Sequence, residues 1–157
     1  MIRRATPADA EMLARLHVQA WQETYPGLLP PEEIAARDIP FRLRQWRGAL
    51  AADTSRIRVL PDLSFAQAGP QRDIKLAETY ADELYCLYLL RAAQGQGHGR
   101  ALLASVRRPA AMTALVLAGN TRASRFYAAS GARIIDTLPC RVGSTDTTEH
   151  VYAWPCP

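Results

Sequence analysis

The stretch QGQGHGR, residues 94–100, decides the fold. It follows the apolar run ELYCLYLL (83–90) and leads into ALLASV (101–106), so it joins a predicted strand to a predicted helix. Its three glycines stand at alternate positions, and glycine is costly to order unless the backbone needs a freedom that a side chain would remove. The first amides of a helix lack internal partners and carry partial positive charge. The stretch therefore predicts an anion-binding turn, to which Arg100 adds charge, with a purely structural tight turn as the alternative.

The spacing of these glycines argues against two common phosphate-binding loops. A P-loop requires G-x-x-x-x-G-K-[ST], and the chain contains no Gly-Lys dipeptide. A dinucleotide fold requires G-x-G-x-x-G near the first strand and an acidic residue at the end of the next strand. Here the spacing is G-x-G-x-G, the unit lies late in the chain, and the predicted strand MTALVLA (112–118) is followed by no acid. A nucleotide-binding domain is therefore a minor alternative.

Strand-like and helix-like segments alternate around this turn, which predicts an α/β fold with a sheet covered by helices. The predicted strands are 1–6, 57–60, 63–69, 83–90, 112–118, 132–138 and 149–154. The predicted helices are one from residue 6 to about residue 23, a short one after Pro31 that Pro40 ends, one or two turns in 41–50, 100–108 and 120–130. Residues 71–82 are expected to form an exposed connection.

Length and composition are typical of one globular domain. The chain has 157 residues, of which 48% are hydrophobic and 22% charged. The three cysteines are odd in number and widely separated, so neither a disulfide framework nor a metal site is expected. The net charge is +4, but the arginines are scattered and Lys75 is the only lysine, so no nucleic-acid partner is expected. The sequence has no apolar run of about 20 residues and no apolar segment near its start, so we expect no membrane contact and a cytoplasmic location.

Two separate motifs carry a family resemblance. The pattern Q-x-x-G-x-G, realised by Gln94, Gly97 and Gly99, resembles the pyrophosphate-binding motif of the GNAT superfamily of acyl-CoA-dependent N-acyltransferases. The segment 119–134 is similar to the second signature of that superfamily, and residues 5–30 are similar to the start of many members. The positions that match the second signature are Asn120, Ala123, Phe126, Tyr127 and Gly131.

The resemblance implies both a fold and an activity. The implied fold is a GNAT-like α/β domain over residues 1–157, with a mixed, mostly antiparallel sheet of about seven strands, a splayed middle pair and flanking helices. The implied activity is transfer of an acetyl or other acyl group from acetyl-CoA to a primary amine, by direct attack in a ternary complex. An acyl-CoA-binding regulatory module without turnover is the alternative. The acceptor is expected to be a small-molecule or peptide amine, and the sequence identifies neither this amine nor the preferred acyl chain. A homodimer is expected.

The resemblance also implies where coenzyme A binds. Its pantetheine arm would bond to the backbone of the strand at Leu87, Tyr88 and Leu89, and its pyrophosphate would lie on the amides of the glycine turn. Asn120 would cap the following helix and help to hold the cofactor. The implied turn residues are Gln94, Gly95, Gln96, Gly97, His98, Gly99 and Arg100.

Two residues are expected to take part in catalysis. Tyr127 would act as the general acid toward the coenzyme A thiolate, by a hydrogen bond more than by full proton transfer. Because residues 123, 126, 127 and 130 have helical spacing, Tyr127 as a core residue is the alternative. Glu83 would take the amine's proton, directly or through water, and an ordinary solvated carboxylate is the alternative.

Three aromatic residues are candidates for the acceptor site. Tyr85 would share a strand face with Glu83. Trp21 and Tyr25, with Thr24 between them, match a region that lines the acceptor pocket in relatives. An aromatic cluster that seals the core is the alternative for that region.

Overall fold

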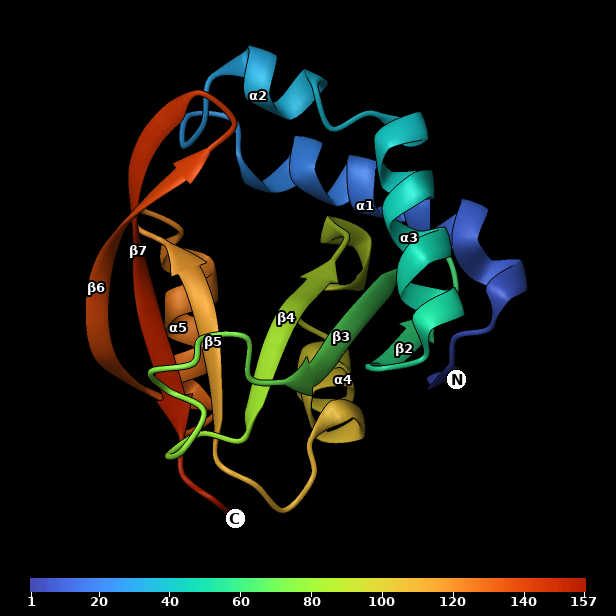
Figure 1. Ribbon diagram of the computed structural model, residues 1–157. Helices are drawn as coiled ribbons and strands as arrows, with labels where there is room; N and C mark the ends of the chain where they lie inside the picture. Colours follow the sequence, from blue (N-terminus) through green and yellow to red (C-terminus); the bar gives the residue numbers. More distant parts are fainter.

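The computed structural model describes residues 1–157 and contains one seven-stranded sheet in the order β1-β2-β3-β4-β5-β7-β6 (Figure 1). Only β4 and β5 run parallel, and every other neighbouring pair is antiparallel. The strands are β1 (Arg3–Arg4), β2 (Arg56–Leu60), β3 (Ser64–Pro70), β4 (Asp82–Leu89), β5 (Met112–Leu117), β6 (Arg133–Val142) and β7 (Thr145–Trp154). The helices are α1 (Ala10–Thr24), α2 (Pro31–Ala35), α3 (Ile39–Ala52), α4 (His98–Val106) and α5 (Thr121–Ala129), with short 3₁₀ turns at Pro7–Asp9 and Arg91–Ala93. The predicted fold class is confirmed.

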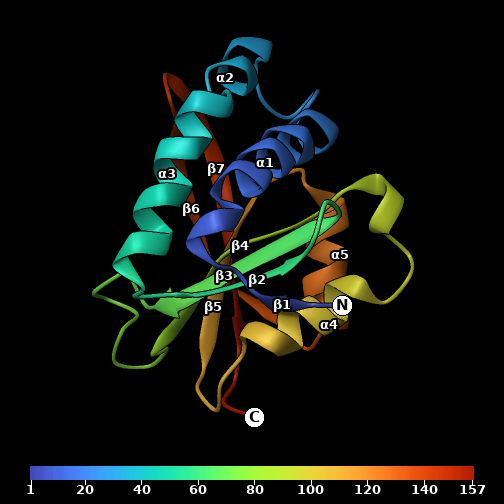
Figure 2. The same cartoon turned by 90° about the vertical axis from the view of Figure 1, so that its right-hand side faces the viewer.

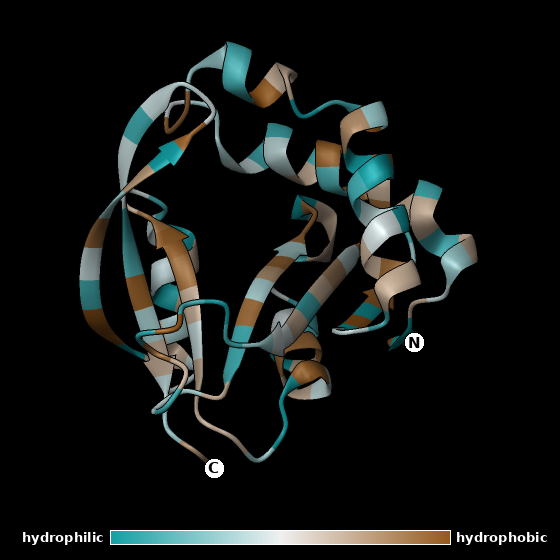
Figure 3. Cartoon of the chain, in the orientation of Figure 1, coloured by the Kyte–Doolittle hydropathy of each residue, from teal (hydrophilic) through white to brown (hydrophobic).

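Helices cover both faces of the sheet (Figure 2). Hydrophobic and hydrophilic residues alternate in bands along α1 and α3 (Figure 3), and residues such as Leu13 and Trp46 are buried with Phe65 of β3 in one hydrophobic cluster. On the other face, α4 and α5 bury Leu102 and Tyr127 against the central strands in a second cluster. The sheet therefore separates two hydrophobic cores.

The middle of the sheet splays open between β4 and β5 (Figure 1). These strands pair only where Asp82–Leu84 lies beside Met112–Ala114, although β4 continues to Leu89. In the β3–β4 pair, Gln67 faces Cys86 and Ala68 faces Leu84, so Tyr85 is the extra residue of a β-bulge. A bulge bends its strand, and this one lies at the point where β4 leaves β5. The gap beyond it is the place for a site.

Several boundaries differ from the predicted ones. Pro40 lies in the first turn of α3 and does not end a helix, since the amide it lacks would be unpaired there anyway. Asp38 caps this helix by accepting a hydrogen bond of 2.9 Å from the Phe41 amide. The result is a helix of 14 residues in place of the expected one or two turns. The closing strands β6 and β7 are also longer than predicted, at 10 residues each.

None of the helices is both long enough and apolar enough to cross a lipid bilayer.

Candidate active site

The glycine turn presents a row of free backbone amides. Gly95 and Gly97 have φ angles of +76° and +80°, in the left-handed region that favours glycine. The first backbone hydrogen bond of the helix joins the Ala101 amide to the Gly97 carbonyl at 3.1 Å, so the amides of residues 95–100 have no acceptor within the protein. The Gln94 side chain donates to the Leu89 carbonyl at 3.0 Å and fixes the turn to the end of β4. This arrangement fits a bound anion.

The third glycine has a different role. A Cβ added at Gly99 would lie 3.1 Å from the ring of Phe126 on α5. Glycine here allows α4 and α5 to approach closely, while the first two glycines set the backbone conformation of the turn. The purely structural interpretation therefore fits the missing side chain of Gly99, and anion binding by the turn stays a prediction.

A cavity of about 510 Å³ opens beside this turn, between β4 and α5. Nine of the predicted cofactor residues and Tyr127 line it: Leu87, Tyr88, Leu89, Gln94, Gly95, Gly97, Gly99, Arg100 and Asn120. Gln96 and His98 do not line it, although their amides belong to the free row. Glu83, Trp21, Tyr25 and Tyr85 also lie outside its lining.

The exposed backbone of β4 extends the cavity along the gap. The Leu90 amide donates to Leu63 at 2.9 Å, so alternation turns the peptide groups of Tyr88 toward β3 and those of Leu87 and Leu89 toward the gap. The predicted backbone role therefore fits Leu87 and Leu89 and does not fit Tyr88. Tyr88 contributes its side chain, whose hydroxyl lies 2.7 Å from that of Tyr25.

Tyr127 combines a buried ring with a hydroxyl that is open to the cavity. The residue is 6% exposed, and its ring packs against Trp154 at a centroid distance of 5.2 Å. Its hydroxyl makes no hydrogen bond within the protein, yet it is not among the sealed polar atoms. Burial raises the pKa of Tyr127, so the phenol stays protonated. Both predicted interpretations describe it: the ring is core, and the hydroxyl is a free donor.

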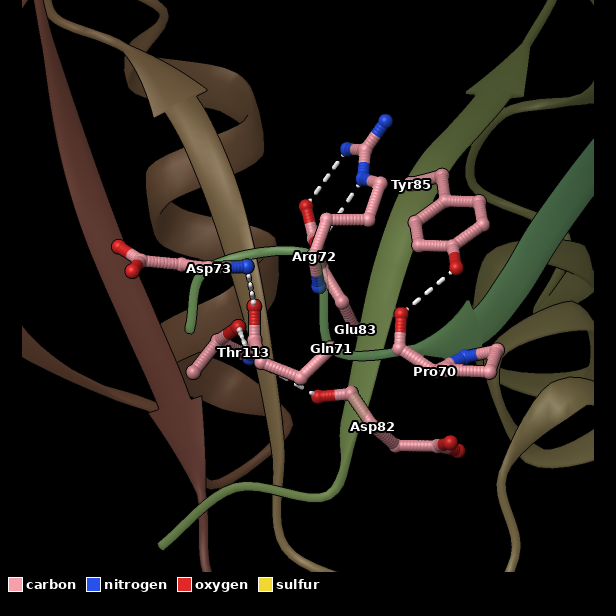
Figure 4. Close-up of polar contacts among 8 residues, drawn as sticks. All are labelled: Pro70, Gln71, Arg72, Asp73, Asp82, Glu83, Tyr85 and Thr113. Atoms are coloured by element: carbon pink, nitrogen blue, oxygen red, sulfur yellow. Dashed lines mark hydrogen bonds and ion pairs between the residues drawn. The ribbon is translucent and has the colours of Figure 1, made fainter. Parts of the chain in front are cut away.

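Glu83 is buried and paired (Figure 4). It is 3% exposed, which contradicts the alternative of a solvated carboxylate. Its carboxylate accepts three hydrogen bonds from Arg72: 3.1 Å from the backbone amide, 3.0 Å from Nε and 2.6 Å from Nη2. Two of these reach Oε2 and one reaches Oε1, so one of the roughly four acceptor positions of a carboxylate stays open on Oε1.

The other three aromatic candidates fall into two places. Tyr85 lies on the Glu83 side of β4, as predicted, where Arg72 stacks 4.1 Å from its ring. Trp21 and Tyr25 pack together at 4.6 Å at the end of α1, which fits the aromatic-cluster alternative. Tyr25 is nevertheless linked to the cavity through its hydrogen bond with Tyr88.

Comparison with known proteins gives a sequence relative and several structural ones. No protein-family profile matches the chain. An uncharacterized N-acetyltransferase of Bacillus subtilis, YuaI, is 33% identical over 108 residues, which are 66% of this chain and 60% of that protein. This chain therefore matches about three fifths of the relative's length.

The solved structures show the fold. The putative acetyltransferase yncA of Salmonella typhimurium, solved with acetyl-CoA, has a TM-score of 0.70 at 18% identity, over 99% of this chain and 92% of that one. A GCN5-related N-acetyltransferase of Rhodopseudomonas palustris has a TM-score of 0.74 at 15% identity, over 100% and 95%. The chain has the GNAT fold.

Within this GNAT fold, the structure adds residues that the sequence patterns did not single out for a site. Arg122, Ala123 and Phe126 of α5 line the cavity; Thr24, which the sequence placed in the acceptor region, lines it as well. Arg122 directly follows the first residue of α5, so a basic side chain beside the Asn120 cap was the signal available for it. No sequence pattern pointed to Arg72 as a site residue, because it lies in a connection without a motif.

Proposed function

We propose that residues 1–157 form one N-acetyltransferase domain that transfers an acetyl group from acetyl-CoA to a primary amine by direct attack in a ternary complex. The observation that carries this proposal is the row of free amides at residues 95–100 beside a cavity that Tyr127 also lines. The name of the Bacillus subtilis relative and the acetyl-CoA in the Salmonella structure support it.

The chain's own groups fit coenzyme A. The free amides and Arg100 would bind its pyrophosphate, with Arg122 as a second cation in the cavity lining. The open peptide groups of Leu87 and the open amide of Leu89 would bond to the pantetheine arm like an added strand. Acetyl-CoA supplies the activated acyl group as a thioester.

The residues around the gap would then promote the transfer mainly by positioning. Tyr127 would donate a hydrogen bond to the leaving sulfur. A thiol has a pKa near 8.5, and the pKa of Tyr127 is raised above its ordinary value of about 10, so a hydrogen bond suits this phenol better than full proton transfer. Glu83 would take the amine's proton through a water bound at the open position of Oε1.

The proposal is tested with purified protein in two assays. Acetyl-CoA should raise the melting temperature, and an amine panel should contain an acceptor that releases free thiol. Stabilisation without thiol release across the panel would identify a regulatory module, and stabilisation by ATP or NAD in place of coenzyme A would identify a nucleotide-binding domain. In the same assay, a kcat that does not fall in Glu83→Gln would remove Glu83 from the proton route.

Further proposals follow from the sequence. We propose a homodimer in the cytoplasm, with no nucleic-acid partner and no metal requirement. Sedimentation, cell fractionation, a nucleic-acid shift assay and activity in the presence of a chelator check these four points in turn.

A further inference from the structure

Arg72 is held at the point where β4 and β5 part (Figure 4). It lies in the connection after β3, and its neighbour Gln71 fixes that connection to both central strands. The Gln71 amide donates to the Ala81 carbonyl at 3.1 Å, and its side-chain nitrogen donates to the Thr113 hydroxyl of β5 at 2.7 Å. The Gln71 side-chain oxygen accepts from the Asp73 amide at 3.2 Å. The backbone of Arg72 is therefore fixed on both sides.

The guanidinium of Arg72 is fixed as well. Nε and Nη2 form a bidentate pair with the buried carboxylate of Glu83, and the group stacks 4.1 Å from the ring of Tyr85. Tyr85 is anchored in turn, because its hydroxyl donates to the Pro70 carbonyl at 2.6 Å. A side chain at Gly69 would collide with that hydroxyl, since a Cβ there would lie 2.7 Å from it. An arginine that is held in this way loses little entropy when it binds a ligand.

One edge of this guanidinium is left open. Nη1 of Arg72 has no partner in the protein, and the side chain is 59% exposed while that of Glu83 is only 4% exposed. The carboxylate lies inside and the cation lies outside, so a molecule that approaches this face of the gap meets the positive group first. Figure 4 shows the guanidinium between β4 and β5, beside the ring of Tyr85.

We propose that Arg72 binds a carboxylate of the acceptor, so that the amine substrate is an amino acid or a similar compound with a carboxylate close to its amino group. This inference rests on the proposed function. Arg72 is then a substrate-binding residue, Glu83 and Tyr85 position it, and Nη1 supplies the hydrogen bond to the acceptor.

The spacing along β4 sets the distance between the carboxylate and the amine of the acceptor. The guanidinium lies over Tyr85, and the open peptide groups of Leu87, beside which the thioester would lie, are two residues further on, about 7 Å along a strand. A charge-assisted hydrogen bond of about 2.8 Å and the three covalent bonds from a carboxylate oxygen to an α-amine nitrogen, about 3.5 Å from end to end with their bond angles, together reach about 6 Å, which would bring the amine close to the thioester. This favours a carboxylate on the carbon that bears the amine.

Matched acceptor pairs test the proposal. The probes are L-amino acids and their carboxamides, assayed with the full-length chain and acetyl-CoA by thiol release. We expect kcat/KM to be about ten- to a hundredfold higher for the acid of a pair, the range of one charged hydrogen bond. The amide's amine holds its proton less tightly, so chemical reactivity alone would favour the amide.

Variants at position 72 connect this preference to the guanidinium. Arg72→Ala removes two hydrogen bonds from Glu83 and so affects both substrates, but kcat/KM for the acid should fall about tenfold more than kcat/KM for the amide, because only the acid loses the contact to its carboxylate. Arg72→Lys keeps the charge without the planar fork and should recover part of the loss. Arg4→Ala removes another exposed arginine, paired with Asp53 at 2.6 Å, and should change neither substrate. An unchanged melting temperature with acetyl-CoA confirms that each variant folds.

Three results would overturn the proposal, each distinguishable from failure of the proposed function. The amides could react as well as the acids, Arg72→Ala could lower kcat/KM equally for acid and amide, or only amines without a carboxylate could be acetylated. In all three the enzyme is active and the carboxylate site is wrong. Absence of thiol release with every amine would instead remove the proposed function, and the carboxylate site with it.

Discussion

The two halves of the gap use different parts of the chain. On the proposed cofactor side, β4, α4 and α5 offer mostly backbone: free amides at residues 95–100, the open peptide groups of Leu87 and the open amide of Leu89. On the other side, the connection 71–81, the bulge of β4 and α1 offer side chains such as Arg72, Tyr85 and Trp21. A backbone site accepts a ligand part that never changes, whereas a side-chain site can be altered by single substitutions. The difference predicts one cofactor and an acceptor that is specific to this chain.

Side-chain contacts also hold the second half together. The Glu33 carboxylate of α2 accepts hydrogen bonds from the Ser144 amide at 2.8 Å and from the Ser144 and Thr145 hydroxyls at 2.9 and 3.2 Å. These hydrogen bonds lower the pKa of Glu33, so the contact persists while the carboxylate is ionised. They join α2 to the tip of the β6–β7 hairpin, two elements far apart in the sequence (Figure 1).

The largest expected effect concerns Tyr127, the side chain that we propose for catalysis on the cofactor side. Tyr127→Phe removes the free hydroxyl and keeps the buried ring, so kcat should fall about a hundredfold. The dissociation constant of coenzyme A should change little, because the amides that bind it are untouched. Steady-state kinetics and calorimetry measure the two quantities.

Tyr152→Phe is the matched control for Tyr127→Phe. Tyr152 is equally buried, packs 5.9 Å from Tyr127 and does not line the cavity. Its loss should leave kcat unchanged. If both variants lose activity to the same degree, the effect comes from packing and the catalytic role of Tyr127 is wrong.

The next effect is a pH dependence on the α1 side. His17 is 4% exposed, its Nδ1 has no partner, and burial together with the charge of Arg42 lowers its pKa to about 2. The unfolded chain binds a proton at this histidine below a pH of about 6.5, while the folded chain does not, so stability is full above that pH and is lost as the pH falls. The free energy of unfolding at pH 5 should be lower than at pH 7 by about 2 kcal/mol from this group.

Urea unfolding at the two pH values measures this loss. His17→Phe should remove it, whereas His150→Ala, at a residue bonded to Thr137 on the exposed sheet edge, should not. The pKa of Asp9 and that of Glu33 are both lowered by their hydrogen bonds, so these carboxylates stay ionised over that pH range. If the free energy of unfolding of His17→Phe still falls by the same amount between pH 7 and pH 5, another group binds the proton.

The smallest of the three effects tests the backbone character of the cofactor site. Gly97→Ala forces a side chain into a left-handed conformation, at a cost of about 1–2 kcal/mol, and should rotate the neighbouring amides. The dissociation constant of coenzyme A should rise about tenfold, which calorimetry measures. Gly131→Ala imposes the same strain, at φ +92° beyond the cavity lining, and should cost stability without changing cofactor affinity. Equal weakening by both variants would contradict a local role of the turn.

Sequence patterns predicted the cofactor half better than the other half, for physical reasons. Gly97 and Asn120 act through their own backbone neighbourhood, so their roles can be read locally: Asn120 does cap α5, accepting from the Ala123 amide at 3.2 Å. Pro40 was misread because a proline is tolerated in a first turn as readily as it ends a helix. The direction of the Tyr88 peptide groups depends on the register of β4 against β3, which no local pattern contains.

The pairing of Arg72 with Glu83 shows the same limit more strongly. The two residues are separated by residues 73–82, and they meet because β3 and β4 are antiparallel neighbours. Glu83 could therefore be selected as a carboxylate near the strand start, while its burial and its partner could not. Contacts between residues far apart in the sequence also join Tyr25 to Tyr88 on this side of the gap.

The close approach of Gly99 to Phe126 couples the two sequence signatures sterically. One belongs to the glycine turn and the other to α5, but any side chain gained at position 99 must displace the aromatic ring at position 126. Each position therefore limits which mutations the other can accept. A substitution at position 99 would therefore need a compensating change or shift at a residue more than twenty positions away.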